Sequence, residues 1–235
     1  MSRSLLYCLA SFWLLILFQT AISDPNKSIR LHSTDNQNNK ELLNGRIWRN
    51  EYLKAVGNQY FLTNTFLKGT VIFNGKKFNN LDLQYDIASD ELILRIESCP
   101  VIILNKEMVD SFSLVFENRS YNVFNAGTDT SSLLRGYINV LYDGPSTLYV
   151  KYSKKLYPLA VDGKYDLFYQ EHRVFVKKGS EIVLVSGRRK FLCLLDDKKK
   201  EIRHYMRTER IRISHRDPGT YVKVLRFYDS IRQAG

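Results

Sequence analysis

The residues best suited to chemistry are four carboxylates that lie close together in the sequence. They are Asp82, Asp86, Asp90 and Glu91, and Asp82 and Asp86 fall on the same polar face of an alternating stretch. Paired carboxylates can act as general acid and general base, and carboxylate oxygens are also ligands for Ca²⁺. The same pattern is more typical of a solvated strand face that runs into a turn. A hydrolase that uses Asp82, Asp86 or Glu91 is therefore a secondary hypothesis.

Other motifs of catalysis or cofactor binding are absent from the sequence. It contains no P-loop, no G-x-G-x-x-G, no H-E-x-x-H, no C-x-x-C and no G-x-S-x-G. The histidines His32, His172, His204 and His215 are scattered, and no Cys or carboxylate completes a metal-ligand spacing around them. We therefore predict no catalytic residue, no metal site and no cofactor. An enzyme stays possible only if its site is assembled from residues distant in the sequence.

A basic segment near the C-terminus is the main candidate for binding. Residues 188–216 contain eleven Lys and Arg against four acids, which accounts for +7 of the chain's formal net charge of +11. A segment of this charge attracts anionic surfaces and polyanions, although it is also typical of a solvated helix face. We predict that the partner-binding face consists of Lys198, Lys199, Lys200, Arg203, Arg207 and Arg210. The expected partner is an anionic envelope component or a protein, and not a nucleic acid, because the chain carries an export signal.

That signal occupies residues 1–23. Arg3 supplies a short positive region, residues 5–18 are apolar, and Ala21 and Ser23 fit a small-x-small cleavage site before Asp24. The apolar run is shorter than the roughly 20 residues of a membrane span. We expect an exported protein, in the periplasm, at the cell surface or secreted, with no transmembrane segment after cleavage. Cys99 and Cys193 then remain, and either one disulfide or two free buried thiols fits their surroundings.

The elements that must position these residues are mainly β-strands. In the central stretch 136–155, two strands flank Asp143-Gly144, a strong hairpin signal. Ile138, Val140 and Tyr142 alternate with Tyr137, Asn139 and Leu141, so that each strand face carries aromatic residues. Asn74-Gly75 marks another hairpin, Tyr60–Phe66 is expected to be a strand, and Leu156–Lys164 is expected to be a loop. About ten strands at short, regular spacing predict a mainly β (α+β) fold over residues 45–187. We expect an antiparallel meander that forms a curved sheet, barrel or sandwich, after a flexible arm at 24–44.

Residues 188–235 are predicted to form a basic pair of helices packed on the β domain. Arg189–Leu195 favours a short helical turn, and Asp196 or Asp197 is expected to cap the next helix. Asp217-Pro218 is typical of the start of a further helix, whose apolar stripe contains Tyr221, Val224, Leu225, Tyr228 and Ile231. Helices with one apolar face must bury it against each other or against the sheet.

This C-terminal segment, KFLCLLDDKKKEIRHYM followed by DPGTYVKVLRFYDSI, resembles a family of exported proteins of unknown function from bacteroidete-type Gram-negative bacteria. The upstream stretches GYINVLYDG and VFVKKGSEIVLV are similar to hairpins of that family. The resemblance implies export and a β-rich body with a Lys-rich helix pair, and it implies no activity.

Three functions remain open from the sequence. The leading hypothesis is a non-enzymatic binding or scaffolding module of the cell envelope with a basic C-terminal face. The alternatives are a carrier that holds an apolar ligand inside the curved sheet, and a hydrolase whose site is assembled from carboxylates. A cavity lined by Tyr and Phe would favour the carrier, whereas converging carboxylates with raised pKa values in a cleft would favour the hydrolase.

Overall fold

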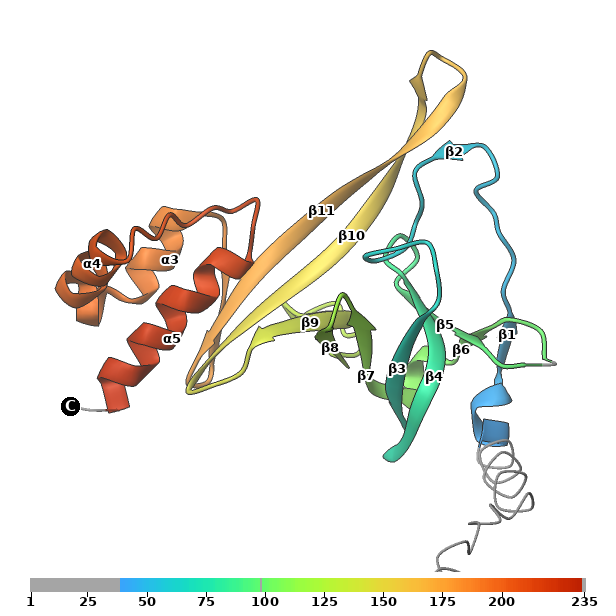
Figure 1. Cartoon of the computed structure of the whole chain (residues 1–235), viewed down its shortest axis with the longest axis horizontal. Coiled ribbons are helices and arrows are strands. Elements are labelled where there is room, and N and C mark those ends of the chain that lie inside the picture. The colour runs from blue at the N-terminus through green and yellow to red at the C-terminus, as the bar shows by residue number, and fades with distance from the viewer. Residues whose placement is uncertain (1–38, 98, 234–235) are drawn as a thin grey trace, which may run out of the picture. The chain divides into compact units, whose positions relative to one another are not determined.

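The computed structural model describes residues 39–97 and 99–233 (Figure 1), so the predicted signal peptide and most of the predicted arm lie outside it. The strands are β1 (Gly45–Ile47), β2 (Ala55–Val56), β3 (Leu67–Phe73), β4 (Lys76–Asp86), β5 (Glu91–Arg95), β6 (Ile102–Leu104), β7 (Val109–Phe116), β8 (Arg119–Asn125), β9 (Tyr137–Tyr142), β10 (Ser146–Val161), β11 (Tyr165–Lys178) and β12 (Glu181–Val185). The helices are η1 (Asn39–Leu43), η2 (Lys106–Met108), α3 (Arg188–Leu194), η3 (Asp196–Lys198), α4 (Lys199–Thr208) and α5 (Gly219–Gln233).

The twelve strands form one open sheet, which confirms the predicted fold class. Their order is β1-β6-β5-β4-β3-β7-β8-β9-β10-β11-β12, and the short β2 pairs separately with β11. The β2–β11 pairing is parallel, whereas the other pairings of the described strands are antiparallel. Because β7 returns to pair with β3, the sheet is two meanders joined side by side. Of the three predicted architectures, the described strands adopt the curved sheet, since β1 and β12 at its ends do not pair with each other.

Because the sheet curves, side chains on its concave face pack against one another and form the main core. Tyr137 on β9 contacts Tyr85 on β4 edge to face, with ring centroids 5.7 Å apart, although β3, β7 and β8 separate the two strands in the sheet. Phe112 on β7 contacts the same Tyr137 at 5.1 Å. Leu42 of η1 is fully buried in this core. The described end of the predicted arm therefore forms a 3-10 helix that packs on the sheet.

Of the two turns predicted from residue pairs, Asn74-Gly75 takes positive φ angles, whereas Asp143-Gly144 joins β9 to β10 without them. Asn74 and Gly75 link β3 to β4 with φ of 49° and 75°, as the left-handed region that Asn and Gly tolerate requires. The predicted strand at Tyr60–Phe66 was wrong, because only Tyr60 makes a β-bridge there. Leu62 has a φ of 65°, which breaks the extended backbone before β3 begins at Leu67.

The predicted loop at Leu156–Lys164 was also wrong. The pairing of β10 with β11 continues to Tyr157, and it resumes at Val161 after a shift in register. Pro158 falls inside that irregularity, where a missing N–H removes no ladder hydrogen bond. Asp162 and Gly163, both with positive φ, make the turn. The result is the long β10–β11 hairpin of Figure 1, which extends well past its pairing with β9.

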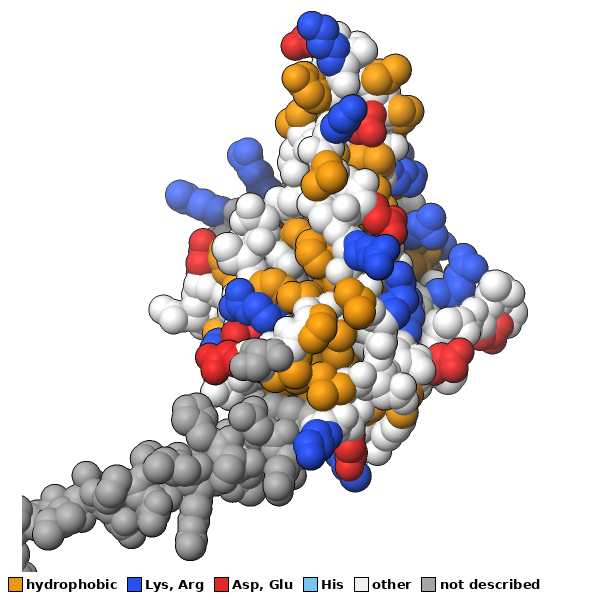
Figure 2. Space-filling view, turned by 90° about the vertical axis from the view of Figure 1, so that its right-hand side faces the viewer, with side chains coloured by type: hydrophobic (Ala, Val, Ile, Leu, Met, Phe, Trp, Pro, Cys, Tyr) orange, Lys and Arg blue, Asp and Glu red, His pale blue; other side chains and the backbone are white. Residues whose placement is uncertain are grey.

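The two ends of this hairpin differ in what covers them. Leu148, Val150, Val174 and Val176 are fully buried in a second core formed with α3, α4 and α5. At the other end, exposed apolar side chains gather on the projection at the top of Figure 2. They are Tyr157, Leu159, Tyr165 and Tyr169, of which Leu159 is the most exposed at 60%. The hairpin thus joins a packed end under the helices to an exposed apolar end.

Candidate functional site

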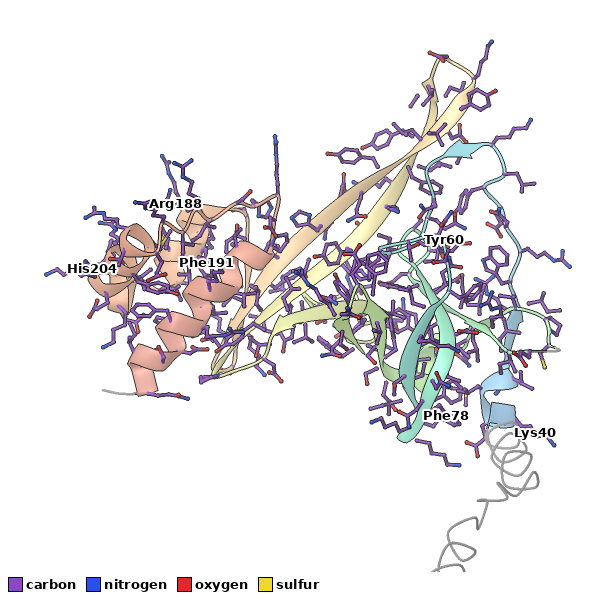
Figure 3. All side chains as sticks on the ribbon, in the orientation of Figure 1. Lys40, Tyr60, Phe78, Arg188, Phe191 and His204 are labelled. Atoms are coloured by element: carbon purple, nitrogen blue, oxygen red, sulfur yellow. The ribbon has the colours of Figure 1, made fainter. Side chains whose placement is uncertain are left out.

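The candidate site lies on the C-terminal helices, so their attachment to the sheet determines its position. Phe191 of α3 is fully buried and contacts the Tyr221 ring of α5 at 4.8 Å. On the neighbouring helix, the Tyr205 ring of α4 stacks on the Phe227 ring of α5 at 4.0 Å. Figure 3 shows Phe191 among the helices, with Arg188 and His204 on their outer side. Tyr221 of the predicted apolar stripe therefore supports α3, and Phe227, which lies outside that stripe, supports α4.

A buried carboxylate attaches α5 to the sheet. Asp229, which is 2% exposed, accepts hydrogen bonds from the Tyr142 hydroxyl at 3.0 Å and from the Ser146 N–H at 3.0 Å. It also accepts one from the Ser146 hydroxyl at 2.7 Å. Tyr142 ends β9 and Ser146 begins β10, so one side chain holds α5 on the central hairpin.

Asp197 makes a second attachment, and it does not cap α4 as predicted. The N-cap position of α4 is Lys198, which makes no side-chain capping hydrogen bond. Asp197 instead accepts hydrogen bonds from the Tyr228 hydroxyl at 2.9 Å and from the Lys178 ammonium at 3.1 Å. Burial alone would raise the pKa of Asp197, but Lys178 and Tyr228 hold it below its ordinary value. Asp197 thus joins η3, α5 and β11 through side chains.

The helices present a groove whose rim is made of arginines. The groove has a volume of about 600 Å³ and an apolar floor formed by Leu192, Met206 and Ile211. Its rim consists of Arg188, Arg203, Arg207, Arg210 and Arg212. These five side chains are exposed, and none lies within 4 Å of a carboxylate among residues 39–97 and 99–233. We call this surface the arginine groove.

A smaller depression of about 260 Å³ adjoins the arginine groove, and we call it the leucine cleft. Leu192, Leu195 and Ile202 supply its apolar side chains, and Leu192 is shared with the groove. Its rim consists of Arg189, Cys193, Asp196, Lys199 and Arg203, of which Arg203 is also shared. The two depressions therefore form one continuous surface on α3, α4 and the segment that follows α4.

The structure divides the six predicted partner-binding residues into two groups. Arg203, Arg207 and Arg210 all line the arginine groove. The three lysines do not: Lys199 pairs with Asp196 at 2.6 Å, Lys198 is half-buried, and Lys200 is exposed away from both depressions.

Sequence reasoning missed two members of the arginine groove. Arg188 precedes the rest of α3, and Arg212 lies in the segment between α4 and α5. Both belong to the basic segment by composition, but no spacing connects them to the face of α4. Only the packing of α3 beside α4 places them on the same rim.

The predicted carboxylates are held by separate partners. Asp82 lies 3.0 Å from the Lys68 ammonium and 3.4 Å from the Arg95 guanidinium. Burial would raise the pKa of Asp82, but these two cations hold it below its ordinary value. Glu91 pairs with Arg46. Both carboxylates are thus held in separate ion pairs.

Asp86 differs from these two, because burial raises its pKa. Its carboxylate accepts hydrogen bonds from the N–H groups of Ala88 at 2.8 Å and Ser89 at 3.0 Å, which partly offset the effect of burial. These bonds hold the tight turn between β4 and β5. The arrangement accounts for a buried carboxylate without a catalytic role.

Asp90, in the same turn, links separate parts of the curved sheet. Its carboxylate lies 2.5 Å from the ammonium groups of both Lys106 and Lys151 and 2.6 Å from the Tyr85 hydroxyl. Burial would raise the pKa of Asp90, but Lys151 and Lys106 hold it below its ordinary value. Burial lowers the pKa of Lys151, and Asp90 partly offsets this. The cluster is a satisfied ion network that ties β10 and η2 to the β4–β5 turn.

Thiols and metal ligands add no further site among the described residues. Cys99 and Cys193 are both free thiols, and Cys193 is exposed rather than buried. Within residues 39–97 and 99–233, no group of three or more His, Cys, Asp or Glu side chains is placed to hold a metal ion. Among the helices that the structure describes, none is both long and apolar enough to cross a membrane.

The sheet itself has a depression of about 310 Å³ that bears on the carrier hypothesis. It is open to solvent rather than enclosed, and its lining combines five polar side chains, Thr70, Lys77, Ser111, Ser113 and Asn122, with five apolar ones, Ile72, Phe112, Val123, Phe124 and Val140. The Tyr and Phe side chains of the concave face contact one another in the main core. This depression therefore lacks the enclosed aromatic lining expected of an apolar carrier.

Comparison with known proteins does not assign the chain to a family. No protein-family model, no curated protein and no solved structure matches the chain.

Proposed function

We propose that this protein is an exported, non-enzymatic binding or scaffolding protein of the cell envelope, and that its arginine groove holds an anionic partner. The observation that supports this proposal is the set of five arginines on one concave rim, none paired with a carboxylate in the described part of the chain. Guanidinium groups stay charged at all physiological pH values and bind carboxylates and phosphates through two parallel hydrogen bonds. Like charges are rarely gathered in this way without a partner, because they repel one another.

The chain offers a matched pair of variants to test the groove. One variant carries Arg203→Gln, Arg207→Gln and Arg210→Gln, and the other carries Lys190→Gln, Lys198→Gln and Lys200→Gln, at residues that line neither depression. Both remove three positive charges from the same segment, but only the first changes the groove. Binding of the mature protein to fluorescent poly-L-glutamate and to phosphatidylglycerol vesicles is then measured over a range of salt concentrations.

We expect the arginine variant to bind its better probe about tenfold more weakly. Each exposed ion pair contributes up to about 1 kcal/mol, and about 1.4 kcal/mol corresponds to a factor of ten in affinity. The lysine variant should change affinity by about threefold or less. If the two variants weakened binding equally, net charge rather than the groove would explain binding and the proposal would fail. Binding of neither probe would also refute it.

Export is tested separately, because the predicted signal at residues 1–23 lies outside the described residues. We expect N-terminal sequencing of the protein from an envelope fraction to begin at Asp24. A cytoplasmic protein that keeps residues 1–23 would contradict the envelope part of the proposal and leave the groove in place.

A further inference from the structure

The floor of the candidate surface indicates that its occupant is more than a polyanion. Leu192 and Ile211 are half-buried between the arginines, and the buried core residues Leu195, Ile202 and Met206 lie beneath them. A surface that binds charge alone has no use for a strip of apolar side chains between its cations. A ligand with apolar groups gains free energy by covering them.

The number and spacing of the arginines indicate how the ligand is charged. Six arginines surround the combined surface: Arg188, Arg189, Arg203, Arg207, Arg210 and Arg212. Within the described part of the chain, the one acid on either rim is Asp196, which Lys199 already pairs. A single phospholipid headgroup with one phosphate would leave most of these guanidinium groups without a partner. Several negative charges, spaced along an apolar strip, would satisfy them.

The lining also distinguishes between kinds of polyanion. No aromatic side chain lines either depression among the described residues. Proteins that bind single-stranded nucleic acids stack the bases on aromatic rings, and this surface offers none. Leu192 and Ile211, half-buried between the arginines, instead offer the apolar contact through which grooves accept amphipathic helices.

From these observations, and resting on the proposed function, we infer that the arginine groove and leucine cleft bind an acidic amphipathic segment of a partner protein. Its apolar side chains cover Leu192 and Ile211, the two apolar side chains of this surface that are only half-buried. Its Asp and Glu side chains pair with the arginines on both rims. Charge complementarity selects the acidic face of this segment, and Leu192 and Ile211 select its apolar face.

The test compares two synthetic peptides that have the same composition of Glu, Ala and Leu. In the first, the Leu residues recur at helical spacing on one face with Glu on either side. In the second, the Leu positions are permuted so that no apolar face exists. Binding of each fluorescent peptide to the mature protein is followed by anisotropy, and phosphatidylglycerol vesicles are used as a third probe.

We expect the amphipathic peptide to bind at least about tenfold more tightly than the permuted one. Replacing the half-buried floor residues, Leu192→Gln with Ile211→Gln, should remove this difference without changing the net charge. Leu133→Gln, at an exposed residue that lines neither depression, is the control and should preserve it. If the double variant failed to fold, the comparison of peptides on the unaltered protein would still decide the inference.

Three results would overturn the inference, and they differ in what they imply for the proposed function. Equal binding of both peptides in an arginine-dependent manner would show that the groove selects charge alone, and the proposed function would survive. Arginine-dependent binding of vesicles without binding of either peptide would identify a membrane surface as the occupant. Binding of no probe would refute the inference and the proposed function together.

Discussion

Replacing Asp229 by Asn should loosen α5 from the sheet at a substantial cost in stability. The carboxylate is buried and accepts three hydrogen bonds, from the Tyr142 hydroxyl and from the N–H and hydroxyl of Ser146. The amide has nearly the same size, but it replaces one acceptor oxygen by a donor that faces other donors. One or two hydrogen bonds to a charged group are then lost, each worth about 1.5–3 kcal/mol. We expect the free energy of unfolding to fall by about 2–4 kcal/mol.

The assay is urea unfolding of the mature protein, monitored by circular dichroism, together with hydrogen exchange of the α5 amides. Asp143→Asn is the matched control, because Asp143 is exposed in the same β9–β10 turn and loses the same charge. Its effect should stay within about 0.5 kcal/mol. If Asp229→Asn cost no more than this control, or left α5 exchange unchanged, the carboxylate would not be the attachment that the structure indicates.

Two further predictions concern the buried cluster at the β4–β5 turn. Lys151 and Lys106 hold the pKa of Asp90 below its ordinary value, so its ionised form stabilises the fold above about pH 4 and this contribution is lost as the pH falls through the folded pKa. The difference in unfolding free energy between the unaltered protein and Asp90→Asn should therefore be largest near neutral pH and shrink toward pH 2–3, as urea titrations at each pH would show. A difference that grew on acidification would contradict this sign. Gly136 and Gly75 both have positive φ, but an added Cβ would overlap the Asp90 carboxylate only at Gly136, since nothing lies within 4 Å of it at Gly75. Gly136→Ala should consequently lower the free energy of unfolding by about 1–3 kcal/mol more than Gly75→Ala, and equal losses would show that the clash is relieved at no cost.

Local chemistry made much of the fold predictable from the sequence. Asn74-Gly75 marks a turn because few other residue pairs tolerate the positive φ angles that a tight hairpin needs. Asp143-Gly144 also falls between two strands, although neither residue takes a positive φ there. Alternation at period two identifies strands, and Asp217-Pro218 marks the start of α5, where the Asp217 carboxylate accepts the Gly219 N–H at 3.0 Å. The predictions for Tyr60–Phe66 and Leu156–Lys164 were wrong. In these segments a single left-handed residue or a tolerated Pro158 mattered more than local propensity.

The candidate site depended more heavily on tertiary structure. Composition alone identified the basic segment and three of the five groove residues, Arg203, Arg207 and Arg210. The sequence could not separate these arginines from Lys198, Lys199 and Lys200, because charge per residue is the same for both types. Nor could it add Arg188 and Arg212, which belong to other segments.

What the sequence by itself determined is thus the local structure and the sign of the charge, because backbone angles, periodicity and ionisation are properties of residues and near neighbours. What only the tertiary structure decided is which charges share a surface. Packing of Phe191 and Phe227 against neighbouring helices places α3 beside α5 and α4 beside α5. That packing brings arginines from separate segments onto one rim over an apolar floor. It depends on contacts between residues that are distant in the chain, and no local sequence pattern predicts such contacts.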